Sequence, residues 1–189
     1  MSVMEDANLV GSCGLYCGLC PRFQSTAPSR CPGCKILCLT LSCKIYNCCV
    51  KNKGLATCAE CDDFPCDKNN PEAHQYEYFV THKVCIPNLY RIKEIGLGIW
   101  LGEQRERRGL LENLLSNYNE GRSMSFYCLA AALMPPELID KVVSELKEKL
   151  AISQSDNSDI KAKAKALRGI IEDLAQEHGI ELELRKKGG

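Results

Sequence analysis

Residues 13–21 read CGLYCGLCP, and this stretch decides how the N-terminal part of the chain folds. Three cysteines fall within eight positions, with two glycines among them and a proline directly after the last. Such a pattern is typical of thiolates that hold zinc, hold an iron–sulfur cluster or form disulfides. The distribution of the other cysteines along the chain helps to decide between these three.

Cysteine is abundant in the first third of the chain and nearly absent after it. Of 14 cysteines in 189 residues, twelve lie between residues 13 and 66, and only Cys85 and Cys128 follow. The two regions therefore need different means of stabilisation. We expect a small metal-stabilised module over residues 1–70, irregular and built of knuckles and short helices. An all-α helical bundle is expected over residues 71–189.

Two pairs in the cysteine-rich region have the C-x2-C spacing of zinc knuckles, in which a tight turn brings both thiolates to one metal. These pairs are Cys31 with Cys34 and Cys58 with Cys61. One such pair is weak evidence, because redox-active thiols share the spacing, but several within 54 residues are strong evidence. The expected metal ligands are Cys13, Cys17, Cys20, Cys31, Cys34, Cys43, Cys48, Cys58, Cys61 and Cys66. We interpret Cys38, Cys49, Cys85 and Cys128 as small buried packing residues.

The cysteine-rich region has too few large apolar side chains to fold by burial alone. Between residues 13 and 66 there are only nine Leu, Ile and Val residues. A segment of that size does not offset its chain entropy without further support. A structural zinc contributes about 10–16 kcal/mol of binding energy that becomes folding energy. We therefore expect this region to be unfolded without its metal.

Zinc and an iron–sulfur cluster remain alternatives, since thiolates suit both. The spacing of Cys13, Cys17 and Cys20 matches that of radical S-adenosylmethionine enzymes, which predicts a cluster on these three residues as the alternative to zinc. More cysteines and then helices follow here, however, where those enzymes form a barrel. Four ligands per zinc and the adjacency of Cys48 and Cys49 favour about two zinc ions. Disulfides or redox thiols are a third reading.

The residues between Cys13 and Cys66 resemble the cysteine-rich family catalogued as domain of unknown function 3795. The similarity lies in the CGL-x-C-x2-CP opening, the CPGC pair, the CKIYNC step and the closing CAECDDFPC. It extends downstream towards residue 135. The resemblance implies a metal-binding module of cytosolic origin and implies no settled activity. Cys38 and Cys49 lie outside the family pattern.

After residue 85, apolar residues recur at helical spacing. Gly96 and Gly98 are expected to break the pattern, and Ser123 to cap the apolar run FYCLAAALM. Pro136 is expected to open a helix, and Ser158 or Asp159 to cap the last one. The tail IELEL alternates by two and predicts an edge strand. The expected helices cover residues 88–95, 99–118, 126–134, 136–150 and 160–178, with a polar linker over 153–159.

Charge and hydropathy argue against several function classes. Residues 13–66 carry a formal charge of +3, and two zinc ions each bound to four thiolates change it to −1. Proteins that bind the phosphate backbone of nucleic acids carry a clear excess of basic over acidic residues, so nucleic-acid binding is not expected. No apolar run is long enough to cross a membrane, and the N-terminus lacks a signal peptide, which predicts a cytoplasmic protein.

No histidine belongs to a recognisable catalytic motif, and a closed site of four cysteines has no open position for water. We therefore expect a non-catalytic adaptor, with structural zinc in the cysteine-rich module and a partner protein bound by the helical domain. The alternative is an iron–sulfur or redox-active protein, and an enzyme would belong to this second class.

Overall fold

The computed structural model describes residues 6–36, 43–69, 77, 81–153 and 159–184. The chain divides into two compact units. The first comprises Met1–Arg105 with Leu184–Gly189, and the second comprises Glu106–Glu183. The boundary falls within helix α5, Leu97–Tyr118. The domain boundary near residue 70 stays a prediction, because compactness does not show which segments fold independently.

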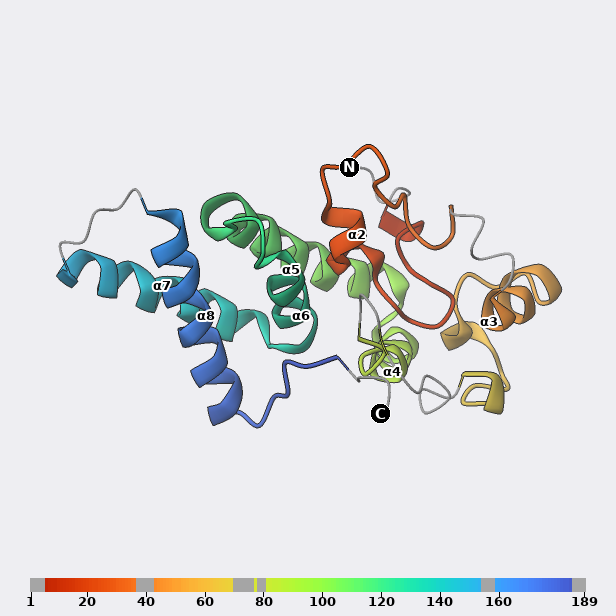
Figure 1. Cartoon of the computed structure of the whole chain (residues 1–189). Coiled ribbons are helices and arrows are strands. Elements are labelled where there is room, and N and C mark those ends of the chain that lie inside the picture. The colour runs from red at the N-terminus through yellow and green to blue at the C-terminus, as the bar shows by residue number, and fades with distance from the viewer. Residues whose placement is uncertain (1–5, 37–42, 70–76, 78–80, 154–158, 185–189) are drawn as a thin grey trace, which may run out of the picture. The chain divides into compact units, whose positions relative to one another are not determined.

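The opening of the first unit is a tight loop (Figure 1). Val10 and Tyr16 form an antiparallel bridge, the Gly11 N–H donates to the Leu15 carbonyl at 2.8 Å, and the Cys17 N–H donates to the Leu9 carbonyl at 2.7 Å. Leu9, Val10 and Tyr16 are buried. The loop thereby holds the first cysteines of CGLYCGLCP on a fixed backbone.

Short helical turns carry four cysteines of the first unit, namely Cys17, Cys48, Cys49 and Cys58. They are held by local backbone bonds, such as Cys20 N–H to Cys17 O at 3.0 Å and Cys61 N–H to Cys58 O at 3.1 Å. The turns are η1 (Cys17–Leu19), α2 (Pro21–Gln24), α3 (Lys44–Tyr46), the π-helical η3 (Asn47–Asn52), η4 (Cys58–Glu60) and η5 (Asp67–Asn69).

Helix α4 (Cys85–Ile95) gives the first unit its apolar support. It packs against η4, and its Tyr90 ring lies 5.1 Å from the ring of Phe64. Leu89 is fully buried on the same helix. At the start of α5, Trp100 meets the Tyr16 ring edge-on at 5.9 Å. Helical side chains therefore cover the sparse core that the cysteine-rich segment cannot build alone.

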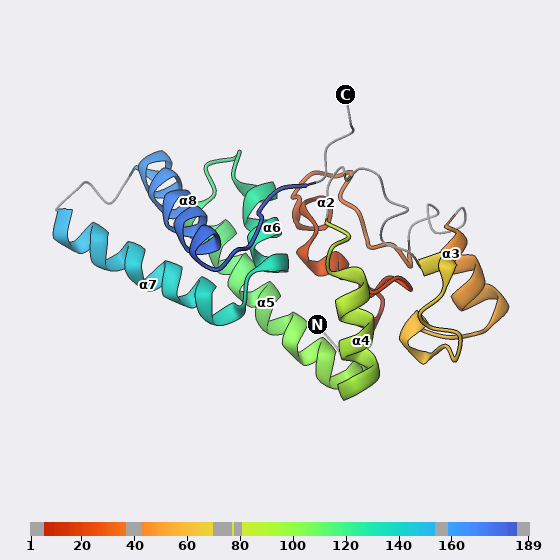
Figure 2. The same ribbon diagram turned by 90° about the horizontal axis from the view of Figure 1, so that it is seen from below.

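The second unit consists of helices, as the periodicity predicts. It holds the rest of α5 with α6 (Met124–Leu133), α7 (Pro136–Ser153) and α8 (Ile160–Glu177). Figures 1 and 2 both show α7 and α8 packed side by side. The Arg107 guanidinium donates to the Met134 carbonyl at 2.6 Å and to the Ala131 carbonyl at 3.1 Å, which binds the C-terminus of α6 to α5.

Three details differ from the sequence-based expectations. Gly98 lies inside α5, so only Gly96, with φ of +82°, breaks the helical pattern. The Ser123 hydroxyl donates to Glu120 Oε1 at 3.0 Å and makes no capping bond to α6. Residues 180–184 form no strand, because no strand in the described part of the chain is there to pair with them.

One cap is confirmed. The Asp159 carboxylate accepts from the backbone N–H groups of Lys161 and Ala162 at 2.9 and 3.3 Å, and so caps α8. Within the described residues, no helix combines the length and the apolar character needed to cross a bilayer.

Candidate metal-binding cysteine clusters

Six cysteines of the first unit form one neighbourhood, which we call the first thiol group. Two hydrogen-bonded thiol pairs define it, Cys13 with Cys85 and Cys17 with Cys34. Cys34 also lies within electrostatic reach of Cys13 and Cys85, which joins the pairs. The group is completed by Cys20 and Cys31, which interact electrostatically with each other.

Local backbone geometry brings Cys34 onto Cys17. Cys17 opens the turn η1 and is buried, and the Cys34 N–H donates to its sulfur at 3.3 Å. The CPGC turn reaches this position through Gly33, whose φ is +111°. A Cβ at Gly33 would lie 3.2 Å from Leu9 Cδ2, which is tight for any larger residue. An amide pointing at a sulfur is the arrangement expected of a zinc knuckle.

The thiol pairs of the first group are electrostatically asymmetric. The hydrogen bond from the Cys17 thiol lowers the pKa of Cys34 to about 7, and the same bond together with burial raises the pKa of Cys17. Likewise, the contact with Cys85 lowers the pKa of Cys13, and the contact with Cys13 and burial raise the pKa of Cys85. In each pair one sulfur therefore carries more thiolate character at neutral pH.

Five further cysteines line a single cavity of about 250 Å³ in the first unit. We call them the second thiol group: Cys48, Cys49, Cys58, Cys61 and Cys66. They come from η3, from η4 and from the segments after η4, which are brought together by the turn between residues 53 and 57. Cys49 hydrogen-bonds to Cys58, and this bond lowers the pKa of Cys49 to about 7.

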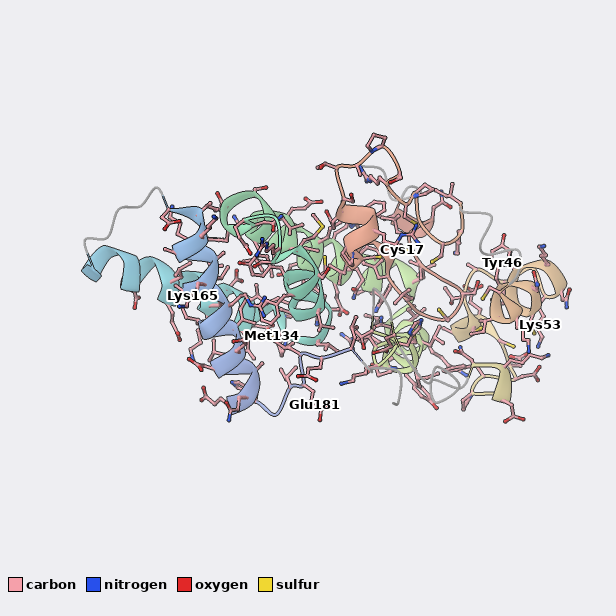
Figure 3. All side chains as sticks on the ribbon, viewed as in Figure 1. Cys17, Tyr46, Lys53, Met134, Lys165 and Glu181 are labelled. Atoms are coloured by element: carbon pink, nitrogen blue, oxygen red, sulfur yellow. The ribbon has the colours of Figure 1, made fainter. Side chains whose placement is uncertain are left out.

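Two lysines point at sulfurs of the second thiol group. Lys53 Nζ lies 3.1 Å from Cys61 Sγ and also pairs with Asp63, and Lys68 Nζ lies 3.6 Å from Cys48 Sγ. Figure 3 labels Lys53 and also Cys17 of the first thiol group. The two ammonium groups therefore place positive charge beside the thiols that line this cavity.

Nine of the ten expected ligands belong to these two groups. The exception is Cys43, which is exposed just before α3 and does not line the cavity. Cys38 falls outside the described residues. Cys85 and Cys49 are buried, as expected of packing residues, as is Cys128. However, Cys85 and Cys49 each contact an expected ligand, a role that their spacing did not reveal.

The sulfurs approach one another in pairs and not in tetrahedra. Among the residues whose placement is described, no three Cys, His, Asp or Glu side chains already form a set that could hold a metal ion. The donor set itself fits zinc or an iron–sulfur centre, since both are held by groups of thiolates. Binding of a metal ion would bring two of these thiol pairs together around the ion.

The fold and the clusters define a class of protein: a cysteine-rich module with two thiol groups, followed by helices. Residues 9–71 match the family model described as protein of unknown function (DUF3795), so the cysteine-rich segment is similar to this family. No curated protein and no solved structure matches the chain. Cys85 lies beyond the matched residues.

Proposed function

We propose that this protein binds metal through its two thiol groups, with one structural zinc in each, and acts as a non-catalytic adaptor. The observation that carries the proposal is the grouping of eleven cysteines around two neighbourhoods, one of them a cavity lined by five thiols. Free cysteine in a core is normally dispersed among apolar side chains. Here the thiols face one another, as metal ligands do.

The surroundings of the second thiol group support metal binding over packing. Lys53 and Lys68 donate to two of its sulfurs, although lysine next to a neutral thiol gains little. A zinc ion with four thiolates carries a net charge of −2, which these ammonium groups offset. Both lysines also interact with Asp63, so a metal–thiolate centre would be a second negative partner for them.

A second candidate, an iron–sulfur centre, is favoured by the size of the cavity. The cavity measures about 250 Å³ and five thiols line it. A single zinc ion needs far less space than that, whereas a four-iron cluster is a body of eight atoms. Hydrogen bonds to cluster sulfurs also tune reduction potentials, and Lys53 and Lys68 are placed to do so.

The adaptor role follows from the chemistry of closed sites. Four thiolates around zinc leave no open position for water or substrate, so such a centre has no hydrolytic activity. The helical part of the chain is then the surface left to bind a protein partner. A site with only three protein ligands would instead favour an enzyme.

The decisive experiment measures metal per chain by plasma mass spectrometry, on protein purified without oxygen and without a metal-affinity tag. The absorption spectrum of the same sample separates the candidates. About two zinc ions and no visible band support structural zinc. Iron with sulfide and a broad band near 400 nm support the cluster. A chain free of both metals would overturn the proposal.

Variants assign the metal to the thiol groups. Cys34→Ser and Cys61→Ser each remove one sulfur from one group and should each lose about one metal equivalent. Cys128→Ser is the matched control, because Cys128 is buried in α6 of the second unit and belongs to neither group. Equal metal content in all three variants would show that the metal is bound elsewhere.

A further inference from the structure

We infer that Cys85, at the first position of helix α4, is a ligand of the metal in the first thiol group. The four ligands of that site would be Cys13, Cys17, Cys34 and Cys85. This inference rests on the proposed metal-binding function and extends it beyond the residues that match the family model, which end at residue 71. Its consequence is that the metal ties a helix to the cysteine-rich loop.

The contact between Cys13 and Cys85 carries the assignment. The two thiols are hydrogen-bonded to each other although 72 residues separate them in the chain. The Cys85 side chain is only 4% exposed. Cys85 therefore already stands beside an expected ligand.

Backbone contacts hold this arrangement in register. A Cβ at Gly14 would lie 2.4 Å from the Cys85 carbonyl oxygen, so the loop touches the first turn of α4 with no room for a side chain. On the other side, Asn88 Nδ2 donates to the Gly14 carbonyl at 2.8 Å. The backbone of Gly14, the residue after Cys13, therefore lies between Cys85 and Asn88, which places the Cys13 loop against the first turn of α4.

Ligand number supports the same four residues. The second pair, Cys17 with Cys34, lies within electrostatic reach of the first, because Cys34 interacts with both Cys13 and Cys85. Two contacting pairs supply the four sulfurs that a structural zinc requires.

The competing explanation is that Cys85 fills a gap in the core as a small apolar residue. Both explanations predict a loss of stability when the side chain is removed, so stability alone cannot separate them. Metal affinity can, because a packing residue leaves the coordination shell intact. Cys128 provides the matched control, being 2% exposed and helical but remote in the chain from any thiol group.

The first test compares Cys85→Ala with Cys128→Ala in the full chain. Zinc per chain is measured at equilibrium with a chromophoric chelator. Cys85→Ala should lose about one zinc equivalent, or hold that ion at least about tenfold more weakly, whereas Cys128→Ala should match the wild type. Equal zinc retention in the two variants would overturn the assignment. A wild-type chain without metal would instead refute the proposed function itself.

The second test needs no variant and so does not depend on folding of a mutant. The wild-type chain is loaded with ¹¹³Cd, and scalar couplings from cadmium to cysteine Hβ protons are recorded by NMR. A correlation to Cys85 together with correlations to Cys13, Cys17 and Cys34 is the expected result. Correlations to those three and a fourth residue other than Cys85 would overturn the inference.

Discussion

Gly14 is the residue at which the loop and α4 come closest. Its φ is +87°, and an added Cβ would also meet Leu89 Cγ at 2.9 Å. We expect Gly14→Ala to destabilise the protein at least about 2 kcal/mol more than left-handed backbone strain alone, because the clash falls on backbone and core atoms. Urea unfolding of the metal-loaded protein measures the loss.

Gly54→Ala is the control for Gly14→Ala. Gly54 also has a positive φ, of +68°, but no atom lies within 4 Å of its added Cβ. Its substitution should therefore cost only about 1–2 kcal/mol of backbone strain. Equal destabilisation by the two alanines would mean that the loop can move away from α4 at no cost.

Lys53 allows a test of the second thiol group at the level of one hydrogen bond. Removing its ammonium in Lys53→Met takes a donor from Cys61 and leaves the ligands in place. We expect metal affinity to fall about tenfold, as for other groups that support metal ligands. Competition with a chelator measures the change. Lys51→Met, an exposed lysine on η3, should leave the affinity unaltered, and equal effects would refute the role of Lys53.

At the scale of single residues, the sequence pointed to ligand pairs only where the two cysteines lie close together in the chain. Cys31 with Cys34 and Cys58 with Cys61 stood out because neighbouring ligands share one turn. Cys85 gave no such signal, since its contact with Cys13 spans 72 residues and depends on how α4 packs. Local spacing reports which residues can share a metal but not which distant residue joins them.

At the scale of elements, apolar periodicity predicted the helices that the structure describes after residue 85. The prediction failed at Gly98 and at the tail IELEL, because glycine can lie within a helix and an alternating segment can lack a partner strand. Gly98 was expected to break a helix, yet it is the second residue of α5, whose first turns are held by the buried side chains of Trp100 and Leu101. The alternation of IELEL predicted a strand, but alternation forms a strand only where a partner strand exists.

Tyr127 links two helices of the second unit and titrates unusually. It is fully buried on α6, and its hydroxyl donates to the Tyr118 carbonyl at 3.1 Å at the end of α5. Burial raises its pKa to about 12. Between pH 10 and 12 the unfolded chain has lost this proton while the folded chain keeps it, so stability falls as pH rises. The expected loss is about 2 kcal/mol.

Tyr127→Phe should remove this pH dependence. The variant is expected to be about 1 kcal/mol less stable at pH 8, because the hydrogen bond is lost, and to lose less further stability by pH 11 than the wild type. Denaturant unfolding at both pH values measures the difference. Tyr90→Phe is the control, since Tyr90 is 50% exposed. If Tyr127→Phe and the wild type lose stability equally, Tyr127 is not the titrating group.

At the scale of the whole molecule, the two units are stabilised by different physical means. The core of the second unit is apolar, with fully buried Leu146, Leu167 and Ile171 on α7 and α8. The first unit has eleven cysteines in two thiol groups and fewer large apolar side chains for its length. Composition alone indicated this contrast, because the cysteines stop where the apolar periodicity begins.

Metal removal should therefore affect the two units unequally. A structural zinc contributes about 10–16 kcal/mol to folding, so stripping the metal with a chelator should unfold the segments that hold the thiol groups. We expect amide hydrogen exchange to rise towards unfolded rates in residues 9–36 and 43–69 and at the start of α4. Protection in α7 and α8 should stay, because neither helix contains a cysteine and their buried side chains are apolar.

The control for metal removal is the same chelator added already saturated with zinc, which should change no exchange rate. Two results would contradict the expectation. Unchanged exchange around the thiol groups after complete metal loss would show that apolar contacts alone hold the first unit. Equal loss of protection in α7 and α8 would show that the metal supports one cooperative structure, with α5 coupling the halves. Unequal loss would instead place the metal's stabilising effect in the part of the chain that ends with α4, where Cys85 is expected to bind.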